Sequence, residues 1–348
     1  MKRKNINIKH LIIGLFGLLM TAAIVSIAAF YYVFNMPNFN HIEDDTYLYI
    51  YENDGFEEVL QALQNKAEIR NVASFVYTAK KLKYNQAIKS GRYKLNNGSS
   101  NLALVRQLRS GNQDPLQLRF NNIRTKEQLA ASLAKQLMVD SLSIITLLND
   151  KDYAQTLGFT DQTIIGMFIP NTYEIFWNIS TANLFKRMKQ EYDSFWTDNR
   201  KAQAAAIPMT ENEVITLASI IQEETNKNDE YPIIAGLYIN RLKINMPLQA
   251  CPTVKYALGD FALRRILNKH LTVESPYNTY QHKGLPPGPI RTPAIVCIDA
   301  VLNYAKHDYL FMAADASMNG RHAFAKTGAE HMRNARKYQQ VLNANGIK

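Results

Sequence analysis

Cysteine is scarce in this chain of 348 residues, which contains only Cys251 and Cys297. Two cysteines are too few for a disulfide framework, although an exported location would permit a single bond between them. Neither cysteine stands at metal-ligand spacing, and the seven histidines form no HExxH pattern. We therefore expect no metal site and no bound cofactor.

The sequence also lacks internal repeats, low-complexity tracts and nucleic-acid recognition motifs. Its formal net charge of +10 would suit nucleic acid, anionic lipid or an acidic polymer as a partner. The basic residues are spread along the chain, so nucleic-acid binding is not expected. With 47% hydrophobic and 20% charged residues, the composition is that of a globular protein long enough for two domains.

A predominantly apolar run of 24 residues without a charge stands near the N-terminus, from Leu11 to Phe34. About 20 apolar residues span a bilayer, so residues 11–34 are predicted to be a transmembrane anchor. Basic residues precede the run, and they place residues 1–10 in the cytoplasm and the rest of the chain outside it. The alternative is a cleaved signal peptide cut near Ser26 and Ala28, although the apolar core of such peptides is usually shorter.

A polar linker is expected over residues 35–45, followed by a small α+β module over residues 46–115. The predicted elements are a strand at 47–51, helices at 56–63 and 72–82, a strand at 90–95 and a helix at 102–108. This β-α-α-β order resembles a LysM module, which implies binding to a β-1,4-linked N-acetyl-sugar polymer. The alternative is a module that merely positions the next domain, because no sugar-contacting residues carry the resemblance.

Residues 116–348 are predicted to form a larger α+β domain organised around the stretch 217–225 (LASIIQEET). Its helix should begin near Thr210, with Glu213 at capping-box spacing. At about 100° per residue, Glu224 lies at the edge of the apolar stripe and Glu223 points toward water. Apolar neighbours raise the pKa of a carboxyl, as a general acid near neutral pH requires. The alternative is a helix-end glutamate satisfied by an arginine or a backbone N–H.

The C-terminal part of this domain alternates helical and turn-rich segments. Helices are expected at 184–200, 233–242 and 332–344, and strands at 310–313 and 322–324. The segment 284–290 (GLPPGPI) is rigid and turn-rich. It would serve either as a wall for an extended ligand or as a stiff surface connection.

Several of these segments occur in the order and spacing of one family: ASIIQEET (218–225), INRL (239–242), LQ (248–249), PT (252–253), YNTY (277–280) and GLPPG (284–288). The chain resembles the YceG-like endolytic murein transglycosylases (MltG type), and Pro170, Thr172 and Tyr173 match an upstream motif of that family. The resemblance implies a single-pass protein of the bacterial cytoplasmic (inner) membrane that cuts peptidoglycan glycan strands and ends their elongation. It also implies association with peptidoglycan synthases.

The resemblance implies that Glu224 is the catalytic residue. It would protonate the oxygen of the β-1,4 bond between N-acetylmuramic acid and N-acetylglucosamine, and the 6-hydroxyl of the muramic sugar would close on C1 to give a 1,6-anhydro end. Thr225 is expected to orient the carboxyl. Gln249, Tyr277, Asn278 and Tyr280 are candidates for holding sugar groups, with structural hydrogen bonding as the alternative. Arg241 and His322 are expected to be structural.

Two positions depart from the family pattern, since Asn171 and Cys251 stand where aspartate is usual. The change at Cys251 removes a carboxylate that would have assisted Glu224. Two other functions stay open at this point. One is a muramidase-type hydrolase that uses water, and the other is a non-catalytic peptidoglycan-binding scaffold.

Overall fold

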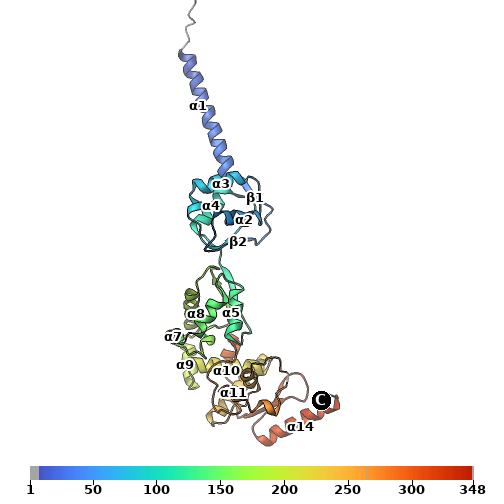
Figure 1. Ribbon diagram of the computed structural model, residues 1–348. Coiled ribbons are helices and arrows are strands. Elements are labelled where there is room, and N and C mark those ends of the chain that lie inside the picture. Colours follow the sequence, from blue (N-terminus) through green and yellow to red (C-terminus); the bar gives the residue numbers. More distant parts are fainter. Residues whose placement is uncertain (1–7, 264, 347–348) are drawn as a thin grey trace, which may run out of the picture. The chain divides into compact units, whose positions relative to one another are not determined.

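The computed structural model describes residues 8–263 and 265–346, and it contains both helices and strands, as predicted (Figure 1). The chain divides into two compact units. The first consists of Met1–Gln117 and Glu174–Asn178, and the second of Leu118–Tyr173 and Ile179–Lys348.

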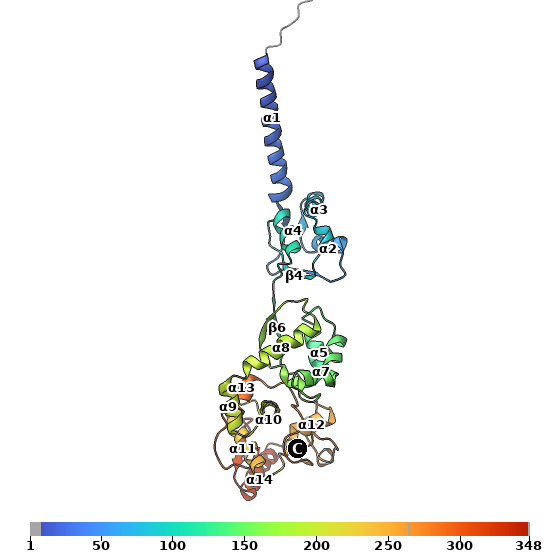
Figure 2. The same cartoon turned by 90° about the vertical axis from the view of Figure 1, so that its left-hand side faces the viewer.

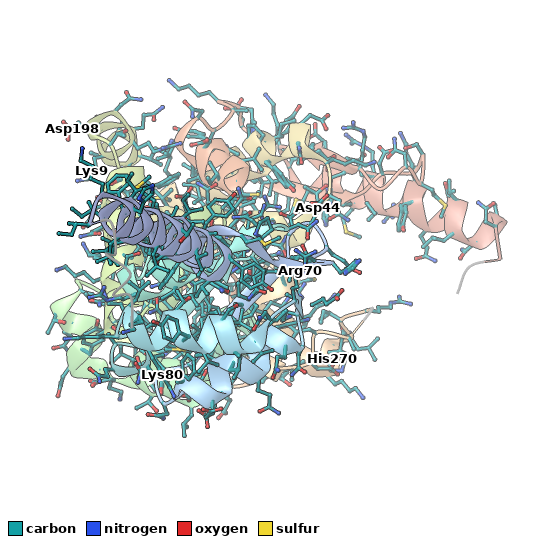
Figure 3. The ribbon with its side chains drawn as sticks, turned by 90° about the horizontal axis from the view of Figure 1, so that it is seen from above. Lys9, Asp44, Arg70, Lys80, Asp198 and His270 are labelled. Atoms are coloured by element: carbon teal, nitrogen blue, oxygen red, sulfur yellow. The ribbon has the colours of Figure 1, made fainter. Side chains whose placement is uncertain are left out.

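The predicted anchor is helical. Helix α1 (Ile8–Phe30) continues into the π-helical turn η1 (Tyr31–Asn35). Side chains extend from α1 on all sides, as the view from above with Lys9 labelled shows (Figure 3). Among the described residues, this is the one helix that is long and apolar enough to cross a membrane, with a mean hydropathy of 2.5. Residues 1–7 lie outside the described residues, so the cytoplasmic basic tail stays a prediction.

The expected linker at residues 35–45 is wrong in part, because Pro37–Asn40 forms strand β1. This strand pairs antiparallel with β3 (Glu68–Ile69) and β5 (Ser99–Ser100). Phe39 is buried and its ring packs edge-on against Phe75. A polar stretch with one buried phenylalanine gave no periodic signal from which a strand could be predicted.

The predicted elements of the small module are present in the expected order. They are β2 (Tyr47–Ile50), α2 (Phe56–Gln64), α3 (Val72–Lys81), η2 (Tyr84–Gln86), β4 (Gly91–Lys94) and α4 (Asn101–Ser110). Strands β2 and β4 pair antiparallel, with Leu48 opposite Tyr93, and both side chains are buried. Gly111 ends α4 in the left-handed conformation, where glycine carries no steric penalty.

The first unit also contains a segment from the middle of the chain. Trp177 packs its ring against Tyr49 and Tyr51, and Asn178 donates a hydrogen bond to the Ser90 carbonyl. The predicted single domain boundary near residue 115 does not account for the return of residues 174–178 to the first unit. The chain passes between the units within β6 (Leu116–Arg119), within β7 (Thr172–Ile175) and again after Asn178, and the two strands pair with each other.

The second unit begins with helices α5 (Lys126–Ala134), α6 (Ser141–Asn149) and α7 (Lys151–Thr156) and the 3-10 turn η3 (Ile164–Met167). Thr125 caps α5, as predicted. The helix expected at 184–200 is instead two helices, α8 (Thr181–Phe195) and α9 (Asp198–Ala206). The break follows Trp196, because the Thr197 side chain caps a new helix by accepting from the Arg200 N–H.

Helix α10 (Glu211–Glu224) is the central element of the second unit. It is packed by α9, α11 (Tyr231–Lys243), α12 (Cys251–Leu258) and α13 (Ile295–Leu302) (Figure 2). Eight consecutive residues, from Val214 to Ile221, are buried. Thr210 and Glu213 form the predicted capping box.

The remaining elements of the second unit complete its C-terminal part. They are the 3-10 turns η4 (Asn228–Glu230) and η5 (Asn268–His270), the antiparallel strands β8 (Phe311–Ala314) and β9 (His322–Ala325), and helix α14 (Gly328–Ala344), which packs on both strands. The end of α10 and the β8–β9 hairpin lie on either side of the pocket described next.

Candidate active site

Glu224 is the last residue of α10 and lines a pocket of about 490 Å³. The other walls come from α11, from the loop that leads into α12, from the loop that contains Tyr280, from the β8–β9 hairpin and from α14. The polar side chains that line the pocket with Glu224 are Tyr238, Arg241, Gln249, Cys251, Tyr280, His322 and His331. Five separate parts of the second unit therefore bring polar groups to this one carboxyl.

Tyr238 is the direct partner of Glu224, and its hydroxyl donates to Glu224 Oε1 at 2.6 Å. Burial raises the pKa of Glu224, while the hydrogen bond from Tyr238 and the nearby His322 and Arg241 lower it; the net shift is upward. The raised pKa agrees with the expectation for Glu224. Because Oε1 is taken by Tyr238, Oε2 is the oxygen left to carry a proton.

The prediction that Glu223 points toward water is wrong. Its Oε1 lies 2.6 Å from Arg291 Nη1 and 2.8 Å from Arg124 Nη2, and its side chain is only 18% exposed. Two guanidinium groups from distant parts of the chain thus neutralise this carboxylate. Glu223 joins residues 124 and 291 to α10 and has a structural role.

Two further residues of the same helix turn hold the segment that follows the GLPPG motif. Ser219 Oγ accepts from the Ile290 N–H at 3.0 Å, and Gln222 Oε1 accepts from the Ala294 N–H at 2.7 Å. Residues 284–287 line a different pocket, so they do not form the expected wall beside Glu224. A Cβ atom at Gly288 would lie 2.3 Å from the Gln162 carbonyl oxygen, so this position requires glycine. The segment therefore lies outside the Glu224 pocket and is anchored to α10.

Thr225 does not orient Glu224 in the way expected. Its hydroxyl donates to Glu230 Oε2 at 2.8 Å and accepts from the Lys227 N–H. Glu230 is 2% exposed and also accepts from the His322 backbone N–H at 2.8 Å and from His322 Nδ1 at 3.1 Å. Thr225 therefore binds Glu230, the residue that positions His322, and has no hydrogen bond to Glu224 among the described residues.

Gln249 and Tyr280 are the predicted sugar-binding residues that the structure does bring to the Glu224 pocket. Gln249 adopts a left-handed backbone conformation (φ 48°), fixed by a bond from its N–H to the Thr279 carbonyl. Its side chain is exposed and has no hydrogen-bond partner among the described residues. Tyr280 places its hydroxyl 3.2 Å from Cys251 Sγ.

Asn278 and Tyr277 lie elsewhere. Asn278 is fully buried and donates to the carbonyls of Leu271 and Val273, while its oxygen accepts from the Tyr280 N–H. With both of its polar atoms bound to the backbone, Asn278 shapes the loop and offers nothing to a sugar.

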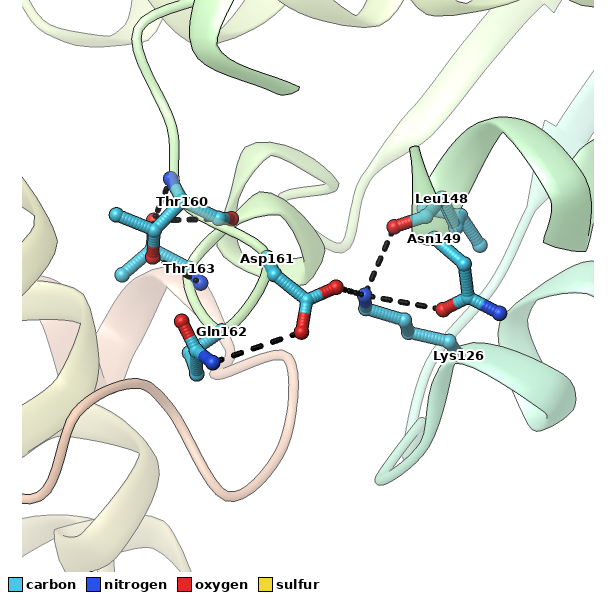
Figure 4. A network of polar contacts seen from close by, with 7 residues as sticks. All are labelled: Lys126, Leu148, Asn149, Thr160, Asp161, Gln162 and Thr163. Atoms are coloured by element: carbon cyan, nitrogen blue, oxygen red, sulfur yellow. Dashed lines mark hydrogen bonds and ion pairs between the residues drawn. The ribbon is translucent and has the colours of Figure 1, made fainter. Parts of the chain in front are cut away.

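Tyr277 lines a second pocket, of about 550 Å³, where its ring lies 4.6 Å from that of Tyr256. Lys126 fixes one side of that pocket by donating to the Leu148 carbonyl and to Asn149 while it pairs with Asp161 (Figure 4).

Arg241 is structural, as expected, although it lines the Glu224 pocket. Its Nε donates to the Leu310 carbonyl and its Nη1 to the Leu248 carbonyl, both at 2.6 Å. These bonds join α11 to the start of β8 and to the loop before α12. The guanidinium thereby fixes the backbone of two pocket walls.

Comparison with known proteins identifies the family of this chain. Residues 48–337 match the YceG-like family. The chain belongs to the YceG-like family. It is 30% identical over 301 residues to an endolytic murein transglycosylase of Bacillus subtilis, which covers 82% of each chain.

Other relatives show similar coverage of this YceG-like chain. It is 26% identical over 317 residues to the endolytic murein transglycosylase of Streptococcus pneumoniae, and the match covers 81% of this chain and 56% of that protein. A crystal structure of a yceG-like protein from Listeria monocytogenes matches with a TM-score of 0.56 and 26% identity, over 83% of this chain and 98% of that one.

The two departures of this YceG-like chain from the family pattern differ in their position. Cys251 lines the Glu224 pocket, whereas Asn171 is exposed and its Oδ1 accepts from the Thr172 N–H outside that pocket. Both cysteines are free thiols, with Cys251 exposed and Cys297 buried. Replacement of aspartate by Cys251 therefore changes the charge of the pocket itself.

The sequence did not single out Tyr238, Phe311 and His331, which line this pocket, or Glu230, which binds His322. Only Tyr238 carried a signal that could have revealed its role, because it places a hydroxyl at a buried position of a helix, two residues before Asn240. Glu230 stands in a polar run, and nothing local distinguishes it from a solvated residue.

Proposed function

We propose that this YceG-like protein is a membrane-anchored endolytic lytic transglycosylase. It would cleave the β-1,4 bond between N-acetylmuramic acid and N-acetylglucosamine in nascent peptidoglycan strands and leave 1,6-anhydro ends, thereby ending strand elongation. The observation that carries the proposal is the pairing of Glu224, a carboxyl of raised pKa in a pocket, with the Tyr238 hydroxyl on one of its oxygens. The names of the relatives from Bacillus and Streptococcus support the same activity.

In this mechanism the proton on Glu224 Oε2 passes to the glycosidic oxygen as the C1–O bond breaks. The 6-hydroxyl of the same muramic sugar attacks C1 and closes the anhydro ring. Glu224, now ionised, is available to accept the hydroxyl proton, so one carboxyl can serve where hydrolysis commonly uses two. Gln249 and Tyr280, which line the same pocket, would bind sugar groups.

The remaining parts of the proposal concern location and partners. Helix α1 would span the bacterial cytoplasmic membrane once, with the N-terminus in the cytoplasm and the pocket outside. The β-α-α-β module would bind glycan in the manner of a LysM module. Peptidoglycan synthases would be the protein partners.

The test is mass spectrometry of the products formed from purified glycan strands. The full chain in detergent is the right sample, because a fragment that starts at Thr46 would lose β1 and its buried Phe39. The wild-type protein should yield 1,6-anhydro ends, and Glu224→Gln should lower their yield by about 10²–10⁴-fold.

The alternatives give different products. Ordinary reducing ends would indicate a muramidase-type hydrolase. Binding of glycan without any cleavage would indicate a scaffold. Wild-type yield from Glu224→Gln would contradict the assignment of the general acid.

A further inference from the structure

The mechanism above leaves one buried ionisable cluster beside the pocket unused. Glu230 Oε2 accepts from Thr225 Oγ1 at 2.8 Å and from His322 Nδ1 at 3.1 Å, and Glu230 Oε1 accepts from the His322 N–H at 2.8 Å. One buried carboxylate thus joins the residue that follows Glu224 to the first residue of β9. The imidazole it holds is itself part of the pocket wall.

The charge of Glu230 fixes the tautomer of His322. Burial alone would raise the pKa of Glu230, but the hydrogen bonds from His322 and Thr225 outweigh burial, and the pKa lies below its ordinary value. An ionised carboxylate can only accept hydrogen bonds, so His322 Nδ1 must carry a proton. The remaining ring nitrogen, Nε2, has no hydrogen-bond partner among the described residues and is available to a ligand.

The other titratable groups around His322 are poor proton acceptors near neutral pH. Burial raises the pKa of the Tyr238 and Tyr280 hydroxyls and of the Cys251 thiol, so these groups stay protonated. Burial lowers the pKa of His331. Its Nδ1 is buried and has no hydrogen-bond partner among the described residues.

The nearby cations do not accept protons either. Arg241 is committed to donating to two backbone carbonyls. Arg321, which precedes His322, pairs with Asp229 at 2.6 Å. Of the two imidazoles that line the pocket, His322 is the one whose ring is oriented by a carboxylate, and its Nε2 faces no partner among the described residues.

We propose that His322 is a second proton-handling residue of the pocket, positioned by Glu230, and that its Nε2 accepts the proton of the attacking 6-hydroxyl. The proposal rests on the proposed function and divides between two residues the roles given above to Glu224 alone. The bond from O6 to C1 forms, the bond from C1 to the leaving oxygen breaks, the O6 proton goes to His322 and the Glu224 proton goes to the leaving oxygen. Transfer of the proton from the imidazolium to the Glu224 carboxylate, directly or through water, restores the starting state.

The test uses the full chain in detergent and measures the rate of anhydro-end formation against pH. His322→Asn keeps a donor toward Glu230 and removes Nε2, so the fold should persist while kcat falls by about 10²–10⁴-fold with little change in KM. The acidic limb of the wild-type profile, which reports a base that must be neutral, should disappear. His282→Asn, an exposed histidine outside the pocket, is the matched control.

Chemical rescue provides a second readout that a purely structural role would not give. Added imidazole should restore part of the kcat of His322→Ala and none of that of Glu224→Gln. The melting temperatures of all variants are compared first; if His322→Ala does not fold, the His322→Asn profile decides.

The possible failures are distinguishable. Wild-type kcat in His322→Asn with an unchanged acidic limb would overturn the inference, as would a loss of rate that leaves both limbs in place and is not rescued by imidazole. Either result, combined with an inactive Glu224→Gln, leaves the proposed function intact. Full activity of Glu224→Gln would instead remove the proposed function.

Discussion

The Tyr238 hydroxyl and the Glu224 carboxyl share a short hydrogen bond of 2.6 Å, although they lie on different helices. This bond has two opposing effects on a general acid. It fixes the direction of the carboxyl, and it also stabilises the ionised form and so reduces the upward shift of the pKa that burial causes.

Tyr238→Phe should therefore raise the pKa of Glu224 further and at the same time loosen the carboxyl. We expect the alkaline limb of the rate profile to move to higher pH, and kcat to fall by about tenfold or more, since a hydrogen bond to a charged group contributes about 1.5–3 kcal/mol. The measurement is anhydro-end yield from pH 5 to 9. An unmoved alkaline limb would show that the limb does not report Glu224.

Glu224→Gln should stabilise the folded protein at neutral pH. The pKa of Glu224 is higher in the folded than in the unfolded chain. The group therefore lowers the free energy of unfolding by its full amount at pH values above the folded pKa. This destabilisation disappears as the pH falls below the unfolded pKa of about 4.3. Glutamine removes the penalty. The melting temperature of the variant should exceed that of the wild type at pH 7.5 and approach it near pH 4, and a lower melting temperature at pH 7.5 would contradict the burial argument.

Glu223→Gln should act on stability and leave most of the activity per folded molecule. Arg124 and Arg291 would lose the carboxylate that neutralises them, and we expect a loss of about 1–3 kcal/mol, between the values for exposed and buried pairs. Urea unfolding measures the change, with the exposed Glu274→Gln as control. Complete loss of activity in a folded Glu223→Gln would reverse the roles of the two glutamates.

Cys251→Ser should retain both stability and activity. The thiol is exposed, and a serine hydroxyl can take over its contact with the Tyr280 hydroxyl, so we expect a change within about 0.5 kcal/mol. Cys251→Asp, which introduces the residue usual in the family, places a second negative charge near Glu224 and should move the alkaline limb to higher pH. Equal losses of folding in Cys251→Ser and Cys297→Ser would instead indicate a disulfide.

A reporter fused after residue 348 tests the topology. If α1 is an uncleaved anchor with its N-terminus in the cytoplasm, a reporter that works only outside the cytoplasm should be active there. The fusion should also stay in the membrane fraction at the mass of the uncleaved chain. Release of a shorter product would support the signal-peptide alternative, and activity of a cytoplasmic reporter would contradict the orientation.

The parts of the site that could be predicted are those encoded within a few residues of the chain. The Thr210–Glu213 capping box and the apolar spacing after it fixed the helix, and with it the phase of Glu224. The error at Glu223 has a different origin, because its partner Arg124 is 99 residues away. Helical phase gives the direction of a side chain but not the charge that another part of the chain brings to meet it.

The same limit explains Glu230 and Thr225. Only the folded β8–β9 hairpin brings His322 to Glu230, 92 residues distant in sequence. The Thr225 hydroxyl reaches the same Glu230 carboxylate only five residues away, but no local pattern distinguishes Glu230 from a solvated residue. Asn278 shows the converse error. Its type and motif suited a sugar, but three backbone groups of its own loop already satisfy its side chain.

Strand β1 begins two residues after η1 ends, and the Asn101 amide donates to the Val33 carbonyl at 2.8 Å within that turn. Helix α1 is therefore joined directly to the folded first unit, with no flexible linker between them. In the proposed topology no flexible tether separates α1 from the first unit, so the first unit itself would be held at the bilayer surface. Any glycan bound by its β-α-α-β module would then be strand that lies close to the membrane.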